Sequence, residues 1–110
     1  MSLTAEVRRH PDGTVEIAFG GEIDIETAHE ISDAVTQILH TEQPPRIALN
    51  MRAVTFIDSV GISALVACFQ AAGVSGTALV VAEPSPNVHR TLWVTGLHGL
   101  FGAPEPALTP

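Results

Sequence analysis

Residues 47–69 read IALNMRAVTFIDSVGISALVACF and join an apolar strand to an apolar helix. The run at 47–49 is typical of a central strand that is covered on both faces. After a loop, the apolar spacing from Ile62 onward predicts a helix that is apolar nearly all round and ends near Gly73 and Gly76. A strand followed by a helix is the repeating unit of a parallel α/β sheet.

The residues before this stretch predict a β-hairpin and a helix. Apolar residues alternate with polar ones over 3–7 and 15–19, on either side of a turn signal at 11–13. We expect the second strand to end at Gly20-Gly21 and Asp24 to cap the following helix. One apolar stripe marks the buried side of that helix, comprising Ala28, Ile31, Val35 and Ile38.

The residues after it predict another strand and another helix. The strand covers 78–81, and Pro84 and Pro86 open the helix, with Val88 and Leu92 on its inner side. Leu97, Leu100 and Phe101 are expected to be the last apolar anchors. The whole order predicts a small α/β domain, with an N-terminal antiparallel hairpin followed by parallel strands that alternate with helices.

The composition limits the function classes. At 110 residues we expect a single domain over 1–110, with a flexible tail at 102–110. The net charge is −7 and there is no lysine, which argues against nucleic acid and anionic membranes as partners. The apolar runs are too short to insert in a membrane, residues 1–10 do not resemble a signal peptide, and the single cysteine, Cys68, suits a buried thiol. These features favour a cytoplasmic protein.

No enzymatic motif is present. Ser59 lies on a strand-to-helix turn, as the nucleophile of an α/β-hydrolase does, but Ile57 stands where the G-x-S-x-G motif needs glycine. The five histidines show no i, i+4 pair for a metal, and no glycine-rich phosphate loop occurs. The carboxylates of Glu22, Asp24 and Asp58 lack a second catalytic group. We therefore expect no catalytic residue, no cofactor and no metal.

Ser59 remains as the candidate functional residue. Its hydroxyl can cap the helix by accepting a backbone N–H, or it can be phosphorylated, and the residues alone leave both roles open. A helix N-terminus tolerates a phosphate, whereas Asp58 beside it would repel one. A group that changes the local charge so sharply suits a switch.

Three stretches resemble the signatures of the STAS domain family. Gly21-Glu22-Ile23-Asp24 followed by Thr27 resembles GELDxxT, and residues 48–61 resemble VLNLxxVxFIDSSG. Residues 85–90 with 95–97 resemble the ending SPxVxR…TGL. The matches occur in the family's order between residues 3 and 101, and they imply a STAS-like fold.

The compact stand-alone members of that family are anti-sigma factor antagonists. The resemblance implies that the unphosphorylated protein binds an anti-sigma factor, which is also a serine kinase of the histidine-kinase-like ATPase type, and so frees a stress-response sigma factor. The kinase then phosphorylates the serine after the motif's Asp, here Ser59, and the complex dissociates. A serine phosphatase restores the binding form. The kinase supplies the ATP, so this chain is not expected to be an enzyme.

We expect the partner to contact a surface formed by 22–26, 55–62 and the near end of the second helix. Ile62 and Leu65 would form its apolar centre, and a phosphate close to Asp58 and Asp24 would weaken docking by repulsion and desolvation. The expected partner-binding residues are Glu22, Asp24, Thr55, Asp58, Ser59, Val60, Gly61, Ile62 and Leu65.

The chain departs from the family pattern at three places. Val60 replaces a frequent second serine or threonine, which leaves one acceptor, and Asn50 stands where many members have Asp. The chain ends soon after Phe101, so the usual C-terminal helix is expected to be short. The alternative function is a STAS scaffold or regulatory subunit of a stress-signalling, anion-transport or lipid-transport complex that is not phospho-switched. Ser59 after Asp58 favours the antagonist.

Overall fold

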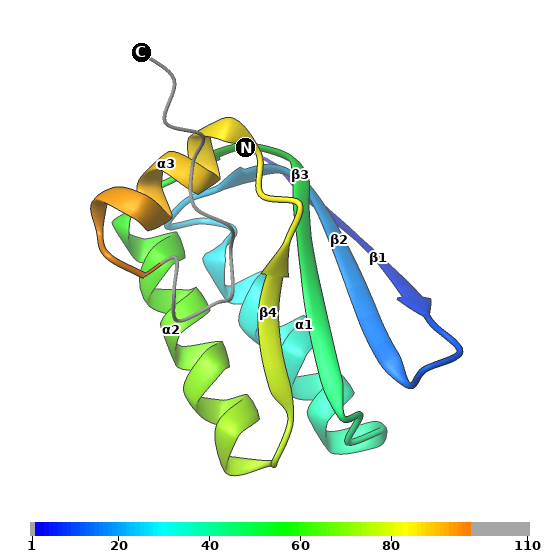
Figure 1. Ribbon diagram of the computed structural model, residues 1–110. Helices are drawn as coiled ribbons and strands as arrows, with labels where there is room; N and C mark the ends of the chain where they lie inside the picture. Colours follow the sequence, from blue (N-terminus) through cyan, green and yellow to red (C-terminus); the bar gives the residue numbers. More distant parts are fainter. Residues whose placement is uncertain (1, 98–110) are drawn as a thin grey trace.

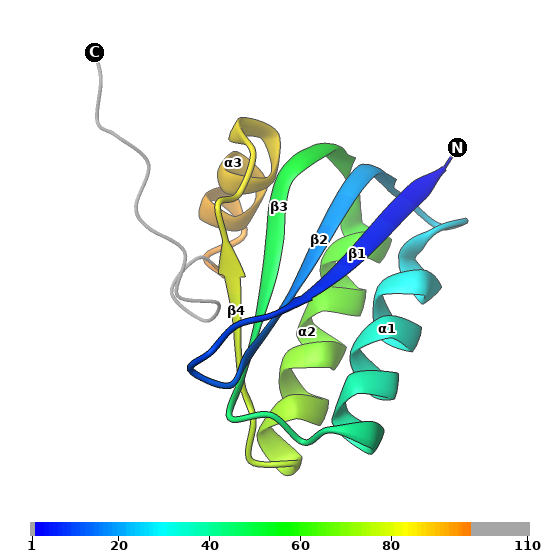
Figure 2. The same cartoon turned by 90° about the vertical axis from the view of Figure 1, so that its right-hand side faces the viewer.

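The computed structural model describes residues 2–97 and confirms the α/β prediction. One sheet has the strand order β1-β2-β3-β4, in which β1 and β2 are antiparallel and the other neighbours are parallel. Helices α1 and α2 lie side by side on one face of the sheet, and α3 packs against β3 (Figures 1 and 2). The elements are β1 (Leu3–Arg9), β2 (Thr14–Ile23), α1 (Ala28–Thr41), β3 (Arg46–Ile57), α2 (Ser59–Val74), β4 (Ala78–Ala82) and α3 (Pro86–Val94).

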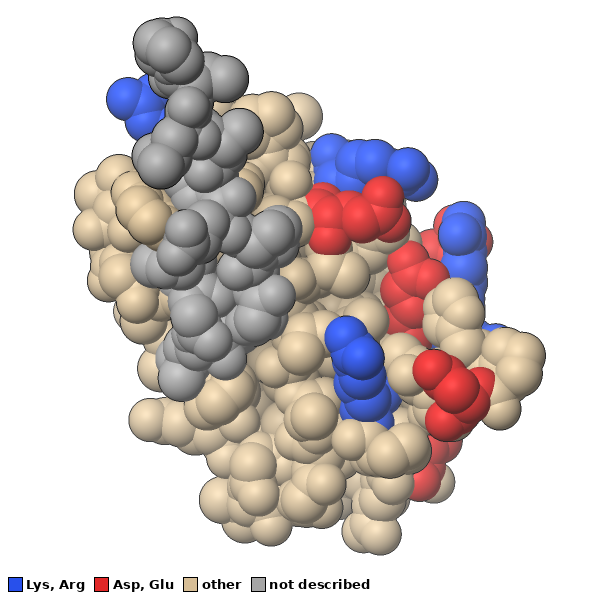
Figure 3. Space-filling model, in the orientation of Figure 1, with Lys and Arg blue, Asp and Glu red and all other residues tan. Residues whose placement is uncertain are grey.

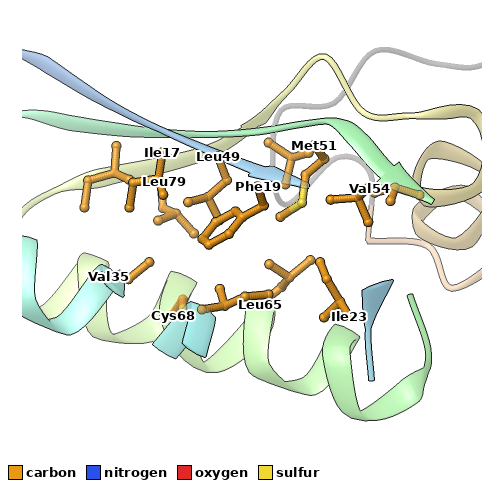
Figure 4. Packing of buried hydrophobic residues seen from close by; sticks show 14 of the residues in the cluster. Ile17, Phe19, Ile23, Val35, Leu49, Met51, Val54, Leu65, Cys68 and Leu79 are labelled. Carbon is orange, nitrogen blue, oxygen red and sulfur yellow. The ribbon is translucent and has the colours of Figure 1, made fainter. Parts of the chain in front are cut away.

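The core lies between the sheet and the pair α1 and α2. All four residues of the expected α1 stripe are buried, as are Leu65 and Cys68 of α2. Figure 4 shows Ile17, Phe19, Leu49 and Met51 of the strands facing these helices. Each fully buried aliphatic or aromatic side chain contributes about 1.5–3 kcal/mol to folding, so this layer supplies most of the driving force.

Two strands are longer than the sequence predicts. Strand β2 does not end at Gly20-Gly21 but continues to Ile23, because register irregularities next to both glycines carry it on beside β3. Gly21 has φ +113°, and a Cβ there would lie 2.3 Å from the Ser2 carbonyl oxygen. Strand β3 likewise runs on to Ile57, so the loop expected after residue 49 is absent.

The later elements follow the prediction closely. Helix α2 ends at Val74, and Gly76 behind it has φ +77°. The N-cap of α3 is Ser85, and Val88 and Leu92 are buried as expected. Leu97 packs against the core. The expected anchors Leu100 and Phe101, the short C-terminal helix and the tail at 102–110 lie outside the described residues.

The sheet face opposite α1 and α2 carries a polar network centred on Asn50. Asn50 is only 6% exposed, and its Nδ2 donates to Glu16 Oε2 (2.9 Å) and to Glu83 Oε2 (3.2 Å), while its Oδ1 accepts from the Arg52 N–H (3.0 Å). Arg52 Nη1 lies 3.5 Å from Glu83 Oε1. Figure 3 shows acidic and basic side chains side by side on this face. The Asn50 amide therefore bridges the carboxylates of Glu16 and Glu83, whereas an aspartate at this position would repel both.

The hydrogen bond from Asn50 is the main cause that holds the pKa of Glu16 below its ordinary value, and a contact with His10 adds to it. A lowered carboxyl pKa stabilises the fold above the pKa of the unfolded chain, about 4.3, and this stability is lost as the pH falls through the folded value.

We predict that Asn50→Asp destabilises the protein by about 1–3 kcal/mol at pH 7, because it brings three carboxylates together and removes the shared donor. Below pH 4 the carboxylates become protonated, so the deficit should shrink. Urea unfolding at pH 7 and at pH 3 measures both values. The control is Gln37→Glu, which adds the same charge at an exposed position of α1. An equal loss of unfolding free energy in both variants would contradict the role of the network.

Candidate functional site

The carboxyl ends of β2 and β3 meet the N-terminal ends of α1 and α2 at one end of the molecule, the upper end in Figures 1 and 2. Ile23 and Ile57 are the last paired residues of the two strands. Immediately beyond them, the Asp58 N–H donates to the Ile23 carbonyl oxygen at 3.1 Å. This bond holds Asp58 against the end of β2, and β2 continues into the loop at 24–27.

Asp58, not Ser59, is the N-cap of α2. Its Oδ1 accepts from the Gly61 N–H at 2.9 Å, and its carbonyl oxygen accepts from the Ile62 N–H at 3.0 Å. Ser59 is the first helical residue, and its side chain is exposed. The capping role considered for Ser59 is therefore wrong, since the neighbouring carboxylate fills it. The Ser59 hydroxyl is left at the surface beside a helix N-terminus.

Gly61 allows the first turn of α2 to lie directly on the strand ends. A Cβ at this position would lie 2.6 Å from Ile23 Cγ2 and 2.8 Å from Ile57 Cγ1, well inside van der Waals contact. Its φ is not in the left-handed region, so close packing and not backbone conformation requires the glycine. The close approach of Gly61 to Ile23 and Ile57 also sets how near the first turn of α2, which includes Ser59, lies to the strand ends.

The loop between β2 and α1 is held by Asp24 and Thr27. Thr27 is 2% exposed; its Oγ1 donates to the Glu22 carbonyl oxygen (2.7 Å) and accepts from the Asp24 N–H (3.0 Å). Asp24 Oδ1 accepts from the N–H groups of Glu26 (2.9 Å) and Thr27 (3.1 Å). The sequence predicts that Asp24 caps helix α1. The helix begins only at Ala28, however, so Asp24 caps the turn before it and the prediction is wrong. The loop is thereby closed on itself.

Helix α3 also reaches this end of the molecule. Asn87 Nδ2 donates to the Thr55 carbonyl oxygen at 2.8 Å, and Thr55 Oγ1 donates to the Gly21 carbonyl oxygen at 3.2 Å. Thr55 thus links β2, β3 and α3. Sequence reasoning did not assign a role to Asn87, which is an exposed polar residue at an unremarkable position of the helix.

The apolar side chains exposed at this end lie within the expected ranges 22–26 and 55–62, but they are not the two residues expected at the centre of the surface. Ile62 and Leu65 were expected at the centre of the surface, but they are 8% and 0% exposed and belong to the core, because they lie on the side of α2 that faces the sheet. The exposed apolar side chains here are instead Ile25 (74%), Phe56 (47%) and Val60 (40%). Ile25 had a detectable signal, an isoleucine between two acids in a loop.

Of the remaining predicted residues, Glu22, Asp24 and Asp58 are half-buried, Thr55, Ser59 and Val60 are exposed, and Gly61 is buried. The structure therefore brings Glu22, Asp24, Thr55, Asp58, Ser59 and Val60 together at the surface. Gly61, Ile62 and Leu65 support that surface from below.

Among residues 2–97, no three His, Cys, Asp or Glu side chains gather in an arrangement that could hold a metal ion. Burial raises the pKa of the Cys68 thiol, which keeps it protonated and poorly nucleophilic. Between residues 2 and 97, no helix is both long and apolar enough to cross a membrane.

Residues 5–108 match the family described as STAS domain. The chain belongs to the STAS domain family. The anti-sigma-F factor antagonist RsfB of Mycobacterium tuberculosis is 32% identical to it over 100 residues, which are 91% of this chain and 80% of RsfB. The STAS signature residues quoted above thus lie within a match over nearly the whole chain.

Solved structures show the same STAS fold. An anti-sigma factor antagonist from Mycobacterium paratuberculosis superposes with a TM-score of 0.78 and 31% identity, covering 97% of this chain and 88% of that one. The phosphorylated form of the Bacillus cell fate determinant SpoIIAA superposes with a TM-score of 0.70 over 96% of this chain and 93% of its own. At 18% identity, the second likeness concerns the fold alone.

We predict that Gly61→Ala destabilises the protein by about 1–3 kcal/mol, because the added methyl group overlaps Ile23 and Ile57. Gly73→Ala in the last turn of the same helix is the control. A Cβ there meets nothing within 4 Å, so we expect a gain of up to about 1 kcal/mol from the higher helix propensity of alanine. Thermal unfolding of both variants tests this, and equal melting temperatures would refute the packing role of Gly61.

Proposed function

We propose that this STAS domain is an anti-sigma factor antagonist. In this proposal the unphosphorylated protein binds an anti-sigma factor that is also a serine kinase of the histidine-kinase-like ATPase type. Phosphorylation of Ser59 ends the binding, and a serine phosphatase restores it. The protein acts in the cytoplasm as a regulator, without an enzymatic activity of its own.

The observation that carries this proposal is the position of Ser59. Its hydroxyl is exposed on the first turn of α2, and Asp58 makes the capping contact in its place. A kinase can therefore modify the hydroxyl without breaking a hydrogen bond that the fold needs. A phosphate there adds a charge of about −1.5 to −2 in the middle of the exposed surface described above.

The relatives support the same function. RsfB and the Mycobacterium paratuberculosis protein are both named anti-sigma factor antagonists, and each match covers at least four fifths of both chains. SpoIIAA, which has the same fold, was solved in a phosphorylated form. Val60 leaves Ser59 as the single hydroxyl directly after Asp58.

We predict that Ser59→Ala binds the cognate anti-sigma factor as tightly as the unmodified protein, and that Ser59→Glu binds it at least tenfold more weakly. The anti-sigma factor kinases of the source organism, purified and tested one by one by calorimetry, provide the measurement. Thermal unfolding is the control, and both variants should melt close to the parent because Ser59 is not the N-cap.

Incubation with the bound kinase and ATP provides a second readout. The parent should gain one phosphate, and Ser59→Ala should gain none. If no anti-sigma factor binds, or if the affinity does not depend on the residue at position 59, the protein belongs to the scaffold or regulatory-subunit class of STAS domains.

A further inference from the structure

Strand β1 is an edge strand whose outer side is open. It pairs with β2 in one unbroken register from Leu3 to Arg9, and no other strand of residues 2–97 joins it. Figure 1 shows β1 at one edge of the sheet, with no helix beyond it. Every residue of the strand after Leu3 is exposed. The strand contains no proline and no bulge, two features that commonly stop an edge strand from pairing further.

The hydrogen bonds of the hairpin show which backbone groups of β1 are left over. The His10 N–H donates to the Thr14 carbonyl oxygen (2.9 Å), and the Glu22 N–H donates to the Ser2 carbonyl oxygen (3.3 Å). Both bonds continue the register of β1 and β2, in which hydrogen-bonded and non-hydrogen-bonded pairs alternate. The even-numbered residues of β1 therefore bond to β2. The backbone N–H and C=O groups that point away from the sheet are those of the odd-numbered residues Leu3, Ala5, Val7 and Arg9.

The side chains of β1 alternate between the two faces of the sheet. Val7 lies opposite a buried residue of β2, on the side that faces the helices, and is itself 40% exposed. Glu6 and Arg8 lie on the open face, where Arg8 Nε is 3.0 Å from Glu6 Oε1. Arg9 Nε donates to Glu42 Oε1 at 2.8 Å, so the charge of Arg9 is already paired. On the open face, β1 thus presents one negative and one positive charge, two residues apart.

We infer that two copies of this chain form a two-fold dimer, in which the outer edges of their β1 strands pair antiparallel with Val7 at the centre. Val7 lies opposite Val7 of the second copy, and Ala5 lies opposite Arg9. These pairs use the backbone groups that β2 leaves free. Glu6 of each copy then lies opposite Arg8 of the other, in a non-hydrogen-bonded pair, where facing side chains are closest.

Charge complementarity selects this register. Centring the pairing on Glu6 would place Glu6 opposite its own copy, and centring it on Arg8 would do the same for Arg8. Like charges directly opposite each other destabilise a sheet, whereas opposite charges stabilise it. Charges on an edge strand usually discourage pairing, but the charges at 6 and 8 match themselves across a two-fold axis. The pairing also closes after two copies, because each copy uses its β1 edge once.

The dimer leaves the end of the molecule that bears Ser59 uncovered in both copies. Val7 pairs with Ile17, and Ile17 lies six residues before the end of β2 at Ile23, or roughly 20 Å along the strand. Because the two β1 strands are antiparallel, the two Ser59 side chains lie at opposite ends of the dimer. Ser59→Glu should therefore dimerise like the parent. The inference does not rest on the proposed function, and its test needs no anti-sigma factor.

Sedimentation velocity of the full chain from about 5 to 500 µM measures the association. Only residues 5–9 of each strand overlap, so the interface is small, and we expect a weak dimer with a Kd of about 10–200 µM. The mass should rise from the 11.6 kDa of one chain toward twice that value. A mass that stays at the value of one chain up to 500 µM would overturn the inference.

Charge reversals test the register. Glu6→Arg and Arg8→Glu each place like charges opposite one another, so each variant alone should dimerise at least tenfold more weakly than the parent. An equimolar mixture of the two should dimerise again, because one chain is then positive at both positions and the other negative. The control is Glu30→Arg, at an exposed position of α1, which should leave the Kd unchanged. Single reversals that dimerise like the parent would refute β1 as the interface.

Amide hydrogen exchange followed by NMR tests the backbone pairing. In the monomer, the N–H groups of Ala5, Val7 and Arg9 face solvent, whereas those of Glu6 and Arg8 are bonded to β2. At concentrations where the dimer dominates, exchange at 5, 7 and 9 should slow at least tenfold, and exchange at 6 and 8 should change little. Unchanged exchange at 5, 7 and 9 in a dimeric sample would overturn the inference.

A proline at the centre of the edge gives an independent backbone test. Val7→Pro removes the central outward N–H and breaks no hydrogen bond to β2, a position where edge strands tolerate proline. It should abolish the dimer and keep a cooperative thermal unfolding transition. A folded Val7→Pro variant that dimerises like the parent would refute the pairing of the β1 edges.

Discussion

The position of the site depends on Asp58, which is bonded both to the sheet and to the helix that follows. Its N–H donates to Ile23 at the end of β2, and its side chain caps the first turn of α2. One residue thus fixes where the helix starts and where it lies relative to the neighbouring strand. Gly61 completes the arrangement, because the absence of a side chain lets the turn rest on Ile23 and Ile57. The exposure of Ser59 follows from these contacts.

The order of the elements could be predicted from local patterns, but the lengths of the central strands could not. Alternation and helical spacing identify the hairpin, α1 and α3, since each has one apolar and one polar side. In β3 the exposed pair Arg52 and Ala53 interrupts the apolar pattern, and the strand continues because β2 follows it through two register irregularities. Pairing between segments more than 30 residues apart decides this, and no local pattern reports it.

The same reasoning explains what was missed at the site. Asp58 and Ser59 are both good N-cap residues, so a shift of one residue changes which side chain is free, and only the bond between Asp58 and Ile23 decides. Helix α2 is apolar on nearly every side, so its sequence does not say that Ile62 and Leu65 face the core. Sequence alone could place Ser59, its acidic neighbours and the segments 22–26 and 55–62, but it could not say which apolar side chains of these segments are exposed.

On the proposed function, the structure separates the stability of the fold from the strength of binding. A phosphate at the first residue of α2 is favoured by the helix dipole by about 0.3–1 kcal/mol, and repulsion from Asp58 offsets this. No capping bond is lost, so the net effect on folding is small compared with the several kcal/mol that an unmatched charge costs in a buried contact. At the N-cap itself, a phosphate would replace the hydroxyl as the acceptor for the first-turn N–H groups, so the modification would change the stability of α2 as well as binding. Because Ser59 lies one residue beyond the cap, its modification leaves the contact between Asp58 and Gly61 in place.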